Sequence, residues 1–259
     1  MTQFKLLALG DVCGRAGLDI LRRKLWGLRK FYGVDFVVAN GENAAGNGIT
    51  PAQARELFDA GADVITLGNH GLHKREIATF LDDEPYIVRP ANWPAGAPGN
   101  GSTIYDTARV RVCVINLIGR VDIGFGAASP FDTVDALLAK HREEADVFVV
   151  DFHAEATSEK CAMAYHLDGR AGVLFGTHTH VQTADERIFP GGLGYITDLG
   201  MTGAADSVIG VKWEQSLAYF RGDMLVRFEE SAKSPRIQGA LFTLDGSGRC
   251  TALERVSVE

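Results

Sequence analysis

Short apolar runs, rich in β-branched residues, alternate with amphipathic stretches along most of the chain. Six of these runs have the length and residue types of buried strands, and each closes on polar or glycine residues. Strands and helices that alternate in this way form βαβ units, so the pattern predicts a mainly parallel sheet. The predicted strands cover residues 5–11, 36–43, 63–70, 111–119, 146–155 and 172–180.

Between these runs, apolar residues recur at spacings of three and four, as on one face of a helix. Pro51 is well placed for the first turn of one such helix. The spacing predicts crossover helices over residues 16–31, 51–60, 74–81, 133–145 and 158–167.

After residue 185 the pattern changes to glycine-rich turns and shorter strands. Near the C-terminus, two alternating runs flank Asp245-Gly246-Ser247-Gly248, as the strands of a β-hairpin would. No Pro- or Ser-rich linker divides the chain, and residues 90–101 fit a surface loop better than a domain boundary. We expect one domain over residues 1–259, with a layered α/β sandwich fold, mainly parallel central sheets, flanking helices and antiparallel C-terminal strands.

The composition is that of a globular protein with a sizeable core, since 46% of the residues are hydrophobic and 23% are charged. No run approaches 18 apolar residues, and the N-terminus lacks the basic segment and cleavage site of a signal peptide. The scattered cysteines form no CxxC pair, which favours reduced thiols and predicts a cytoplasmic protein without membrane contact. These cysteines are Cys13, Cys113, Cys161 and Cys250.

The formal net charge of −7 argues against a broad nucleic-acid surface, which needs many Lys and Arg residues on one face. A small phosphorylated nucleotide is compatible with this charge. The basic residues between Arg22 and Lys30 fit a solvated helix face. The sequence leaves the oligomeric state open, and a homo-oligomer would be ordinary for a cytosolic enzyme.

Side chains that can bind metals follow five of the predicted strands. Ligands of open α/β sheets bind at the carboxyl ends of parallel strands, so these side chains should converge at one edge. Taken singly, an Asp or Asn after a strand is more often a helix cap or turn residue, and a lone His is more often structural. The joint pattern favours a metal site. The candidates are Asp11, Glu42, Asn43, Asn69, His70, His153, His178 and His180.

Carboxylate, amide and imidazole ligands without a thiolate cluster suit divalent Fe, Mn, Zn or Co. So many ligands exceed the needs of one tetrahedral ion and suit two ions bridged by a carboxylate, as in phosphoryl transfer. His178 and His180, two residues apart, should point to one side of a strand, where each can take a different ion. Other catalytic sites fit less well. The chain has no GxxxxGK[ST] motif for an ATP-binding loop and no GxSxG motif for a serine hydrolase, and it lacks the Arg six residues after Cys13 that a cysteine phosphatase would need.

The chain contains, in order, GDVCGRAG, NGENAAGNGIT, GNHGLHK, DFHAEATSEK and GTHTHVQTAD. These motifs resemble the calcineurin-like metallophosphoesterases and, more closely, their YmdB-like bacterial subfamily of the 2′,3′-cyclic-nucleotide 2′-phosphodiesterase type. The resemblance spans about residues 5–225 and implies a metallophosphoesterase-type fold. It departs from the wider superfamily at Cys13, where a His is usual, and at Glu42, where an Asp is usual, and both departures belong to the subfamily.

The resemblance also implies roles for individual residues and for the cofactor. It implies two divalent ions, with iron favoured and Mn or Zn as substitutes. Glu42 would bridge the ions and His70 would be the general acid. One ion would be held by Asp11, Glu42, Asn43 and His180, and the other by Glu42, Asn69, His153 and His178.

Together these features predict a dinuclear-metal phosphodiesterase that acts on small nucleotides, in particular 2′,3′-cyclic nucleotides. A water shared by two divalent ions would give hydroxide at neutral pH, and His70 would protonate the departing alkoxide. The alternatives are a phosphomonoesterase of the same fold and a non-catalytic, metal-dependent protein that binds nucleotides or regulates a partner. Substrate specificity would lie in loops such as 90–101 and 125–131.

Overall fold

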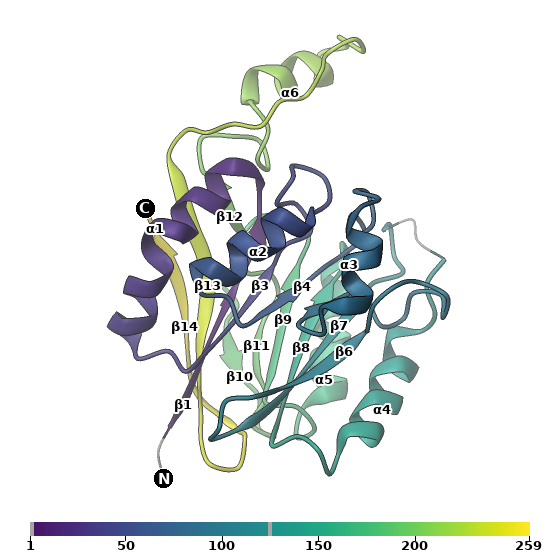
Figure 1. Ribbon diagram of the computed structural model, residues 1–259, viewed down its shortest axis with the longest axis vertical. Helices are drawn as coiled ribbons and strands as arrows, with labels where there is room; N and C mark the ends of the chain where they lie inside the picture. Colours follow the sequence, from purple (N-terminus) through teal and green to yellow (C-terminus); the bar gives the residue numbers. More distant parts are fainter. Residues whose placement is uncertain (1–2, 124–125) are drawn as a thin grey trace.

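Two β-sheets pack face to face and carry helices on their outer sides in this computed structural model (Figure 1). The structure describes residues 3–123 and 126–259. The arrangement confirms the predicted layered α/β sandwich. All six predicted strands are present, but several end earlier than expected, because their polar motif residues lie in the loops that follow.

The first sheet has eight strands in the described part of the chain. Neighbours β1, β3, β4 and β5 run parallel, whereas β13 is antiparallel to both β1 and β14, so the predicted C-terminal hairpin is confirmed. The order is β2 (Asp11–Val12), β12 (Met201–Ala204), β13 (Pro235–Leu244), β1 (Phe4–Leu9), β3 (Phe36–Asn40), β4 (Val64–Thr66) and β5 (Ile87–Val88), with β14 (Cys250–Val258) paired to β13.

The second sheet has six strands in the same described residues, and its four central strands run parallel. Its two edge strands are antiparallel to their neighbours. The strand over residues 102–106 was not predicted, and the strand over residues 187–188 lies where shorter strands were predicted without bounds. The order is β10 (Arg187–Ile188), β11 (Gly194–Ile196), β9 (Val173–Thr177), β8 (Val147–His153), β7 (Arg111–Ile118) and β6 (Ser102–Asp106).

Helices cover the outer face of each sheet, while the inner faces pack on each other. Both faces of the central strands are therefore buried, which explains their continuous apolar runs. Leu6 and Val38 of the first sheet meet Val114 and Val149 of the second in the shared core. The first sheet carries α1 (Gly14–Tyr32), α2 (Pro51–Ala60) and α3 (Ile77–Asp83), and the second carries α4 (Pro130–His141) and α5 (Thr157–Leu167).

The helix starts follow local capping chemistry. Pro51 occupies the first turn of α2, as predicted, and Thr50 forms a capping box with Gln53. The predicted bounds of α4 were wrong, because Ser129 caps the helix and Pro130 starts it earlier than the apolar spacing suggests. The helix predicted over residues 74–81 differs in the opposite direction, because α3 begins only at Ile77.

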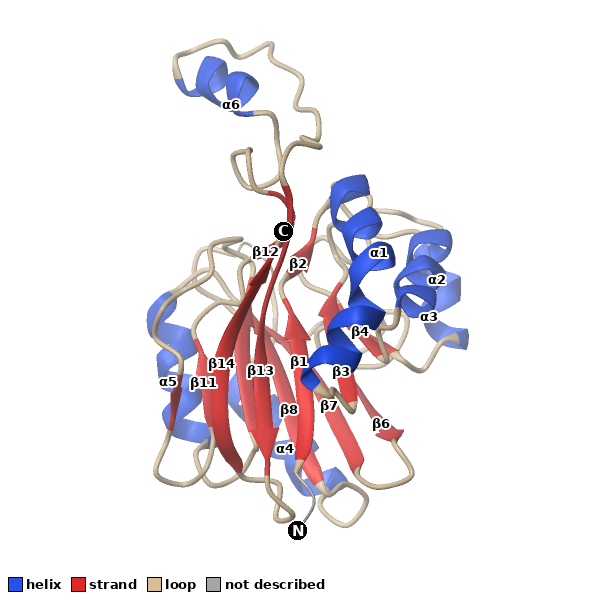
Figure 2. Cartoon of the chain, turned by 90° about the vertical axis from the view of Figure 1, so that its left-hand side faces the viewer, coloured by secondary structure: helices blue, strands red, loops and turns tan. Residues whose placement is uncertain are grey.

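Residues 205–234, the excursion between β12 and β13, project away from the two sheets in both views (Figures 1 and 2). This excursion carries the short helix α6 (Trp213–Phe220), which was not predicted. The predicted loop over residues 90–101 connects β5 to β6, whereas the loop predicted over 125–131 begins outside the described residues and ends within α4. In the described residues, no helix combines the length and apolarity needed to cross a membrane.

Candidate metal centre

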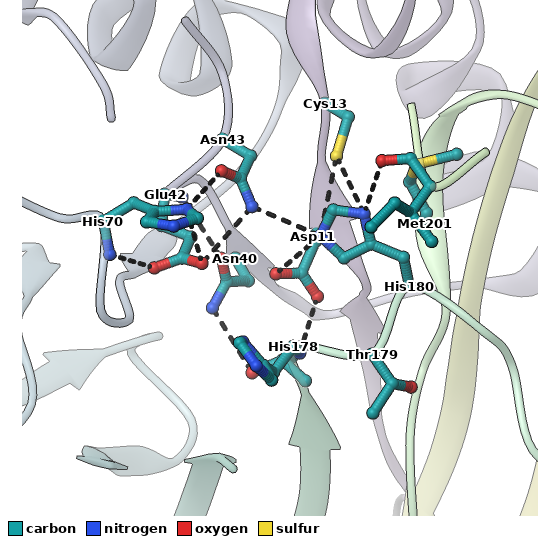
Figure 3. A network of polar contacts seen from close by, with 12 residues as sticks. Asp11, Cys13, Asn40, Glu42, Asn43, His70, His178, Thr179, His180 and Met201 are labelled. Atoms are coloured by element: carbon teal, nitrogen blue, oxygen red, sulfur yellow. Dashed lines mark hydrogen bonds and ion pairs between the residues drawn. The ribbon is translucent and has the colours of Figure 1, made fainter. Parts of the chain in front are cut away.

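The sequence-predicted site residues come together at the carboxyl edge that the two sheets share, where Figure 3 labels Asp11, Glu42, Asn43, His70, His178 and His180. The first sheet supplies Asp11 at the start of β2 and residues from the loops after β3 and β4, and the second sheet supplies the last residue of β8 and residues from the loop after β9. The convergence across two layers follows from the parallel strands of both sheets pointing toward the same edge. Asp11 follows β1, Glu42 and Asn43 follow β3, Asn69 and His70 follow β4, His153 ends β8, and His178 and His180 follow β9.

Four side chains form what we call the His153 half of the site: Glu42, Asn69, His153 and His178. His153 Nε2 lies 2.9 Å from Asn69 Oδ1, 3.0 Å from His178 Nδ1 and 3.1 Å from Glu42 Oε1. Glu42 and His153 are fully buried. Ligand atoms of Glu42, His153 and His178 all lie within 4.8 Å of one another, an arrangement that can hold a divalent ion.

A buried hydrogen-bond chain behind His153 fixes the orientation of its ring. The Thr177 hydroxyl donates to Asp151 Oδ1 at 2.7 Å and lies 2.9 Å from His153 Nδ1. Because this hydroxyl uses its hydrogen on Asp151, it accepts the Nδ1 hydrogen of His153, which leaves Nε2 for a ligand role. Sequence reasoning missed both partners, although Asp151 stands two residues before His153 on the same strand face.

Gly68 brings the chain unusually close to this half of the site. A Cβ atom at this position would lie 2.4 Å from Glu42 Oε2 and 2.4 Å from His153 Nε2. Any larger residue would displace one of the two side chains. The glycine before Asn69 is therefore required for the backbone to pass behind the convergent ligands.

The other half of the site, the Asp11 half, consists of Asp11, Asn43 and His180, next to the shared Glu42. Asp11 is fully buried and its Oδ2 accepts a hydrogen bond from the His178 backbone N–H at 3.1 Å. Its Oδ1 is buried without a hydrogen-bond partner in the described residues, and lies 3.7 Å from His180 Nε2. An unpartnered buried carboxylate oxygen is costly unless a cation or another donor satisfies it, so the residues present fit a cation here.

The backbone around His178 and His180 differs from the prediction. β9 ends at Thr177, and His178 and His180 have φ values of 104° and 63°. The prediction that the two side chains share one side of a strand was wrong, because strand alternation does not apply to a left-handed backbone. Non-glycine residues in this region carry strain, which recurs at functional sites.

His70 lies beside both halves and is partly exposed, with 31% of its side chain accessible. Its backbone N–H donates to Glu42 Oε2 at 2.9 Å, and its Nδ1 lies 2.8 Å from Asn43 Oδ1. Burial and the neighbouring His73 lower the pKa of His70, against the opposing effect of Glu42.

Burial and charge act against each other in the His153 half. Burial disfavours the imidazolium form of His153, but the carboxylates of Glu42, Asp11 and Asp151, Glu42 foremost, together outweigh this effect and raise the pKa of His153 to about 9. Burial would raise the pKa of Glu42, yet His153 and His70 lower it. Burial and the adjacent His153 lower the pKa of His178 to about 3. The His153–Glu42 pair therefore carries a proton that a bound divalent cation would displace.

The excursion also contributes to the site. The Ile209 carbonyl accepts a hydrogen bond from His180 Nδ1 at 3.0 Å, which directs Nε2 of the same ring toward Asp11. Next to this contact lies a cavity of about 460 Å³, lined in part by His180, Met201 and Ile209. Nothing in the composition of residues 205–234 indicated this role, because the contact is made by a backbone carbonyl.

Comparisons with known proteins show which proteins this chain resembles over its length. A Bacillus subtilis (strain 168) protein named 2′,3′-cyclic-nucleotide 2′-phosphodiesterase is 41% identical over 256 residues, which are 98% of this chain and 97% of that protein. A crystal structure described as a novel phosphatase from Mycoplasma pneumoniae has a TM-score of 0.93 at 34% identity, covering 100% of this chain and 94% of that one. A hypothetical protein from Thermus thermophilus has a TM-score of 0.91 at 38% identity, covering 98% of each chain.

The family described as YmdB-like protein matches residues 7–256, so the match includes every motif of the resemblance and extends to the C-terminal hairpin. The predicted resemblance is confirmed, and the relatives that are named for an activity are phosphodiesterases or phosphatases. The chain therefore belongs to the YmdB-like protein family and is a phosphoester hydrolase.

Proposed function

We propose that this enzyme hydrolyses 2′,3′-cyclic nucleotides with the help of two divalent ions and a histidine acid. The convergence of three ligand-type atoms on His153 Nε2, within about 3 Å, is the observation that carries the metal proposal. The name of the Bacillus subtilis relative supports the substrate class. The free cysteines, all within the described residues, support a cytoplasmic location.

In this proposal Glu42 is shared by the two halves of the site. Asn69, His153 and His178 would complete the ligand set of one ion, and Asp11, Asn43 and His180 that of the other. Divalent ions supply Lewis-acid chemistry when bound, since they polarise phosphoryl oxygens and lower the pKa of a water nucleophile. Iron is our first choice because the family resemblance implies it, and Mn or Zn are substitutes, since mixed oxygen and imidazole donors accept all three.

His70 is proposed as the general acid that protonates the leaving oxygen. Nδ1–H of His70 can donate to Asn43 Oδ1, 2.8 Å away. In the doubly protonated ring, Nε2 then holds the proton that can be transferred. Burial lowers the pKa of His70 below the ordinary value for histidine. The doubly protonated ring therefore becomes scarce once the pH rises above this lowered pKa. The proposed acid step therefore predicts a rate that declines toward alkaline pH once metal loading is complete.

Replacing His70 by Ala tests this role. We expect His70→Ala to keep its metal content and to lose about 100- to 10,000-fold in hydrolysis rate on a 2′,3′-cyclic nucleotide. His73→Ala is a matched control, because the two ring centroids are 4.9 Å apart but His73 is exposed and bonds to Asn47 instead. A metal-loaded His70→Ala protein with the parent rate would contradict the acid assignment.

A substrate panel tests the substrate class. Cyclic nucleotides, linear diesters and monoesters should be compared after metal analysis, with Fe, Mn and Zn each added back. We expect cyclic nucleotides to give the highest kcat/KM. A preference for monoesters would favour the phosphomonoesterase alternative, which the name of a Mycoplasma pneumoniae relative, putative phosphatase/phosphodiesterase, also allows. Inactivity on every substrate would favour the regulatory alternative.

A further inference from the structure

The segment that follows β9 adopts a conformation that its own sequence does not favour. Neither His178 nor His180 is a glycine, yet both have positive φ values, 104° and 63°. An L-residue in this region meets steric strain from its Cβ atom, so surrounding contacts must hold the backbone in place.

A buried ion pair makes these contacts. Lys160 of α5 and Asp198, which precedes β12, are 1% and 0% exposed, and Lys160 Nζ lies 2.8 Å from Asp198 Oδ2. Lys160 Nζ also donates to the Thr177 carbonyl at 2.9 Å, and Asp198 Oδ2 accepts from the Thr179 N–H at 3.1 Å. The pair thus holds the backbone on both sides of His178.

Asp198 and Lys160 also make close contacts with the residues next to the segment. Asp198 Oδ1 accepts a hydrogen bond from the Gly200 N–H at 2.9 Å, at the start of β12. Gly176 allows Lys160 to cross β9 closely, since a Cβ at this position would lie 2.8 Å from Lys160 Cδ and 1.9 Å from the Thr197 carbonyl oxygen. The lysine, the aspartate and the strained segment therefore form one tightly packed unit.

We propose that Lys160 and Asp198 are positioning residues that hold His178 and His180 in their left-handed conformations before a cation binds. This inference rests on the proposed role of the two histidines as metal ligands. A buried ion pair gives little net stability compared with a well-packed apolar pair, so we attribute its presence here to the geometry that it imposes. The hydrogen bonds to Thr177 and Thr179 transmit that geometry to the ligands.

Metal binding by a single variant, which leaves Asp198 unpaired, and by a double variant, which removes both charges, tests the proposal. Lys160→Met and the double variant Lys160→Met/Asp198→Asn should bind Mn²⁺ about 10- to 100-fold more weakly than the parent, the range for residues that orient ligands. With Co²⁺ as a probe, their visible absorption should also differ from that of the parent, because the ligand geometry relaxes. Neither readout needs substrate.

Arg29→Met is the matched control. It breaks another ion pair of low exposure, in which Arg29 Nη1 lies 2.9 Å from Asp63 Oδ2, with side chains 15% and 14% exposed. Asp63 precedes β4, so this pair lies at the opposite edge of the sheet from the candidate site. The control should lower Tm and leave the Mn²⁺ affinity and the Co²⁺ spectrum unchanged.

The outcomes separate this inference from the proposed function. A parent protein that binds no Mn²⁺ at the site would overturn the metal proposal and the positioning role with it. If the parent binds Mn²⁺ and the folded double variant has the same Mn²⁺ affinity and the same Co²⁺ spectrum, the positioning role alone is overturned.

Hydrogen exchange tests the same point without any substitution. In the metal-depleted wild-type protein, the Thr179 amide should exchange at least about tenfold more slowly than an unstructured amide, because Asp198 accepts its hydrogen bond. Exchange at the unstructured rate would show that the segment is not held in advance and would overturn the proposal, even if neither variant folds.

Discussion

The two halves of the candidate site are built differently. In the His153 half, Asn69 Oδ1, His178 Nδ1 and Glu42 Oε1 all lie within 3.1 Å of His153 Nε2. In the Asp11 half, His180 Nε2 lies 3.2 Å from Asn43 Nδ2 but 3.7 Å from Asp11 Oδ1, and Asp11 Oδ1 has no hydrogen-bond partner in the residues that the structure describes.

The supports of the two halves also differ. A strand end, a threonine hydroxyl and a buried aspartate fix the ring of His153. His180, by contrast, is oriented by the carbonyl of Ile209 in the excursion, and Asn43 Oδ1 faces His70 rather than Asp11. Because preorganised ligands bind more tightly, we expect the His153 half to bind its ion first and the Asp11 half to bind more weakly.

Removing the residue that the halves share should have the largest effect. Glu42→Gln keeps the size of the side chain but removes its charge, so we expect weak binding at both halves and a loss of about 1,000-fold or more in kcat. Glu155→Gln is the control, since its Oε2 lies 3.1 Å from His178 Nε2 and its side chain is exposed. Metal content and initial rates measure both effects, and a Glu42→Gln protein with two bound ions would refute the shared role.

Separate variants of the two halves should distinguish their affinities. His153→Ala removes a proposed ligand, so it should weaken the tighter ion by about 100-fold or more, beyond the loss for residues that only orient ligands, and should lower the stoichiometry at micromolar metal. His180→Ala should lose the weaker ion and retain the tighter one. Isothermal titration with Mn²⁺ resolves the two steps, and the reverse order of losses would contradict the comparison.

The pH dependence of binding should report the proton held by the His153 half. Nearby carboxylates, Glu42 foremost, raise the pKa of His153 to about 9, so in the metal-depleted protein the pair stabilises the fold fully below the ordinary His pKa of about 6.5, and this contribution is lost as the pH rises toward 9. Mn²⁺ affinity should change in the opposite direction, rising up to about tenfold per pH unit over this interval, because one proton must leave.

Thermal unfolding and Mn²⁺ titration between pH 6 and 9 measure the two trends. Glu42→Gln should flatten both, because it removes the charge that contributes most to the raised pKa of His153. Affinity that is independent of pH in the parent would show that no proton is displaced from this half.

The smallest effect is expected at Cys13 in the Asp11 half. Its Sγ lies 3.7 Å from His180 Nδ1, and burial, with Asp11 and Glu42 nearby, raises the pKa of its thiol. The thiolate is therefore disfavoured, and Cys13→Ser should keep the rate within about threefold. A loss as large as that of His70→Ala would instead point to a nucleophilic cysteine.

The convergence of the site residues could be predicted from the sequence, whereas the contacts that orient them could not. Polar residues after buried strands predicted the convergence at one edge, because parallel strands impose that geometry whatever the details of packing. Thr177 and Asp151 could not be paired from sequence, since their contact depends on β8 and β9 being neighbours in register.

Contacts that cross between elements were also unpredictable. Lys160 lies on a helix and Asp198 on a loop, 38 residues apart, and neither spacing nor composition indicates that they meet. The left-handed backbone at His178 and His180 was missed for a related reason. No glycine marks these positions, so local propensity predicted an extended strand, and tertiary contacts overrode it.

An anomalous difference map from a Mn²⁺-loaded crystal tests the central claim most directly. We expect two peaks on either side of Glu42, a stronger one beside His153 and His178 and a weaker one beside Asp11 and His180. A map with no peak at this edge of the sheets, or with a single peak at saturating Mn²⁺, would contradict it.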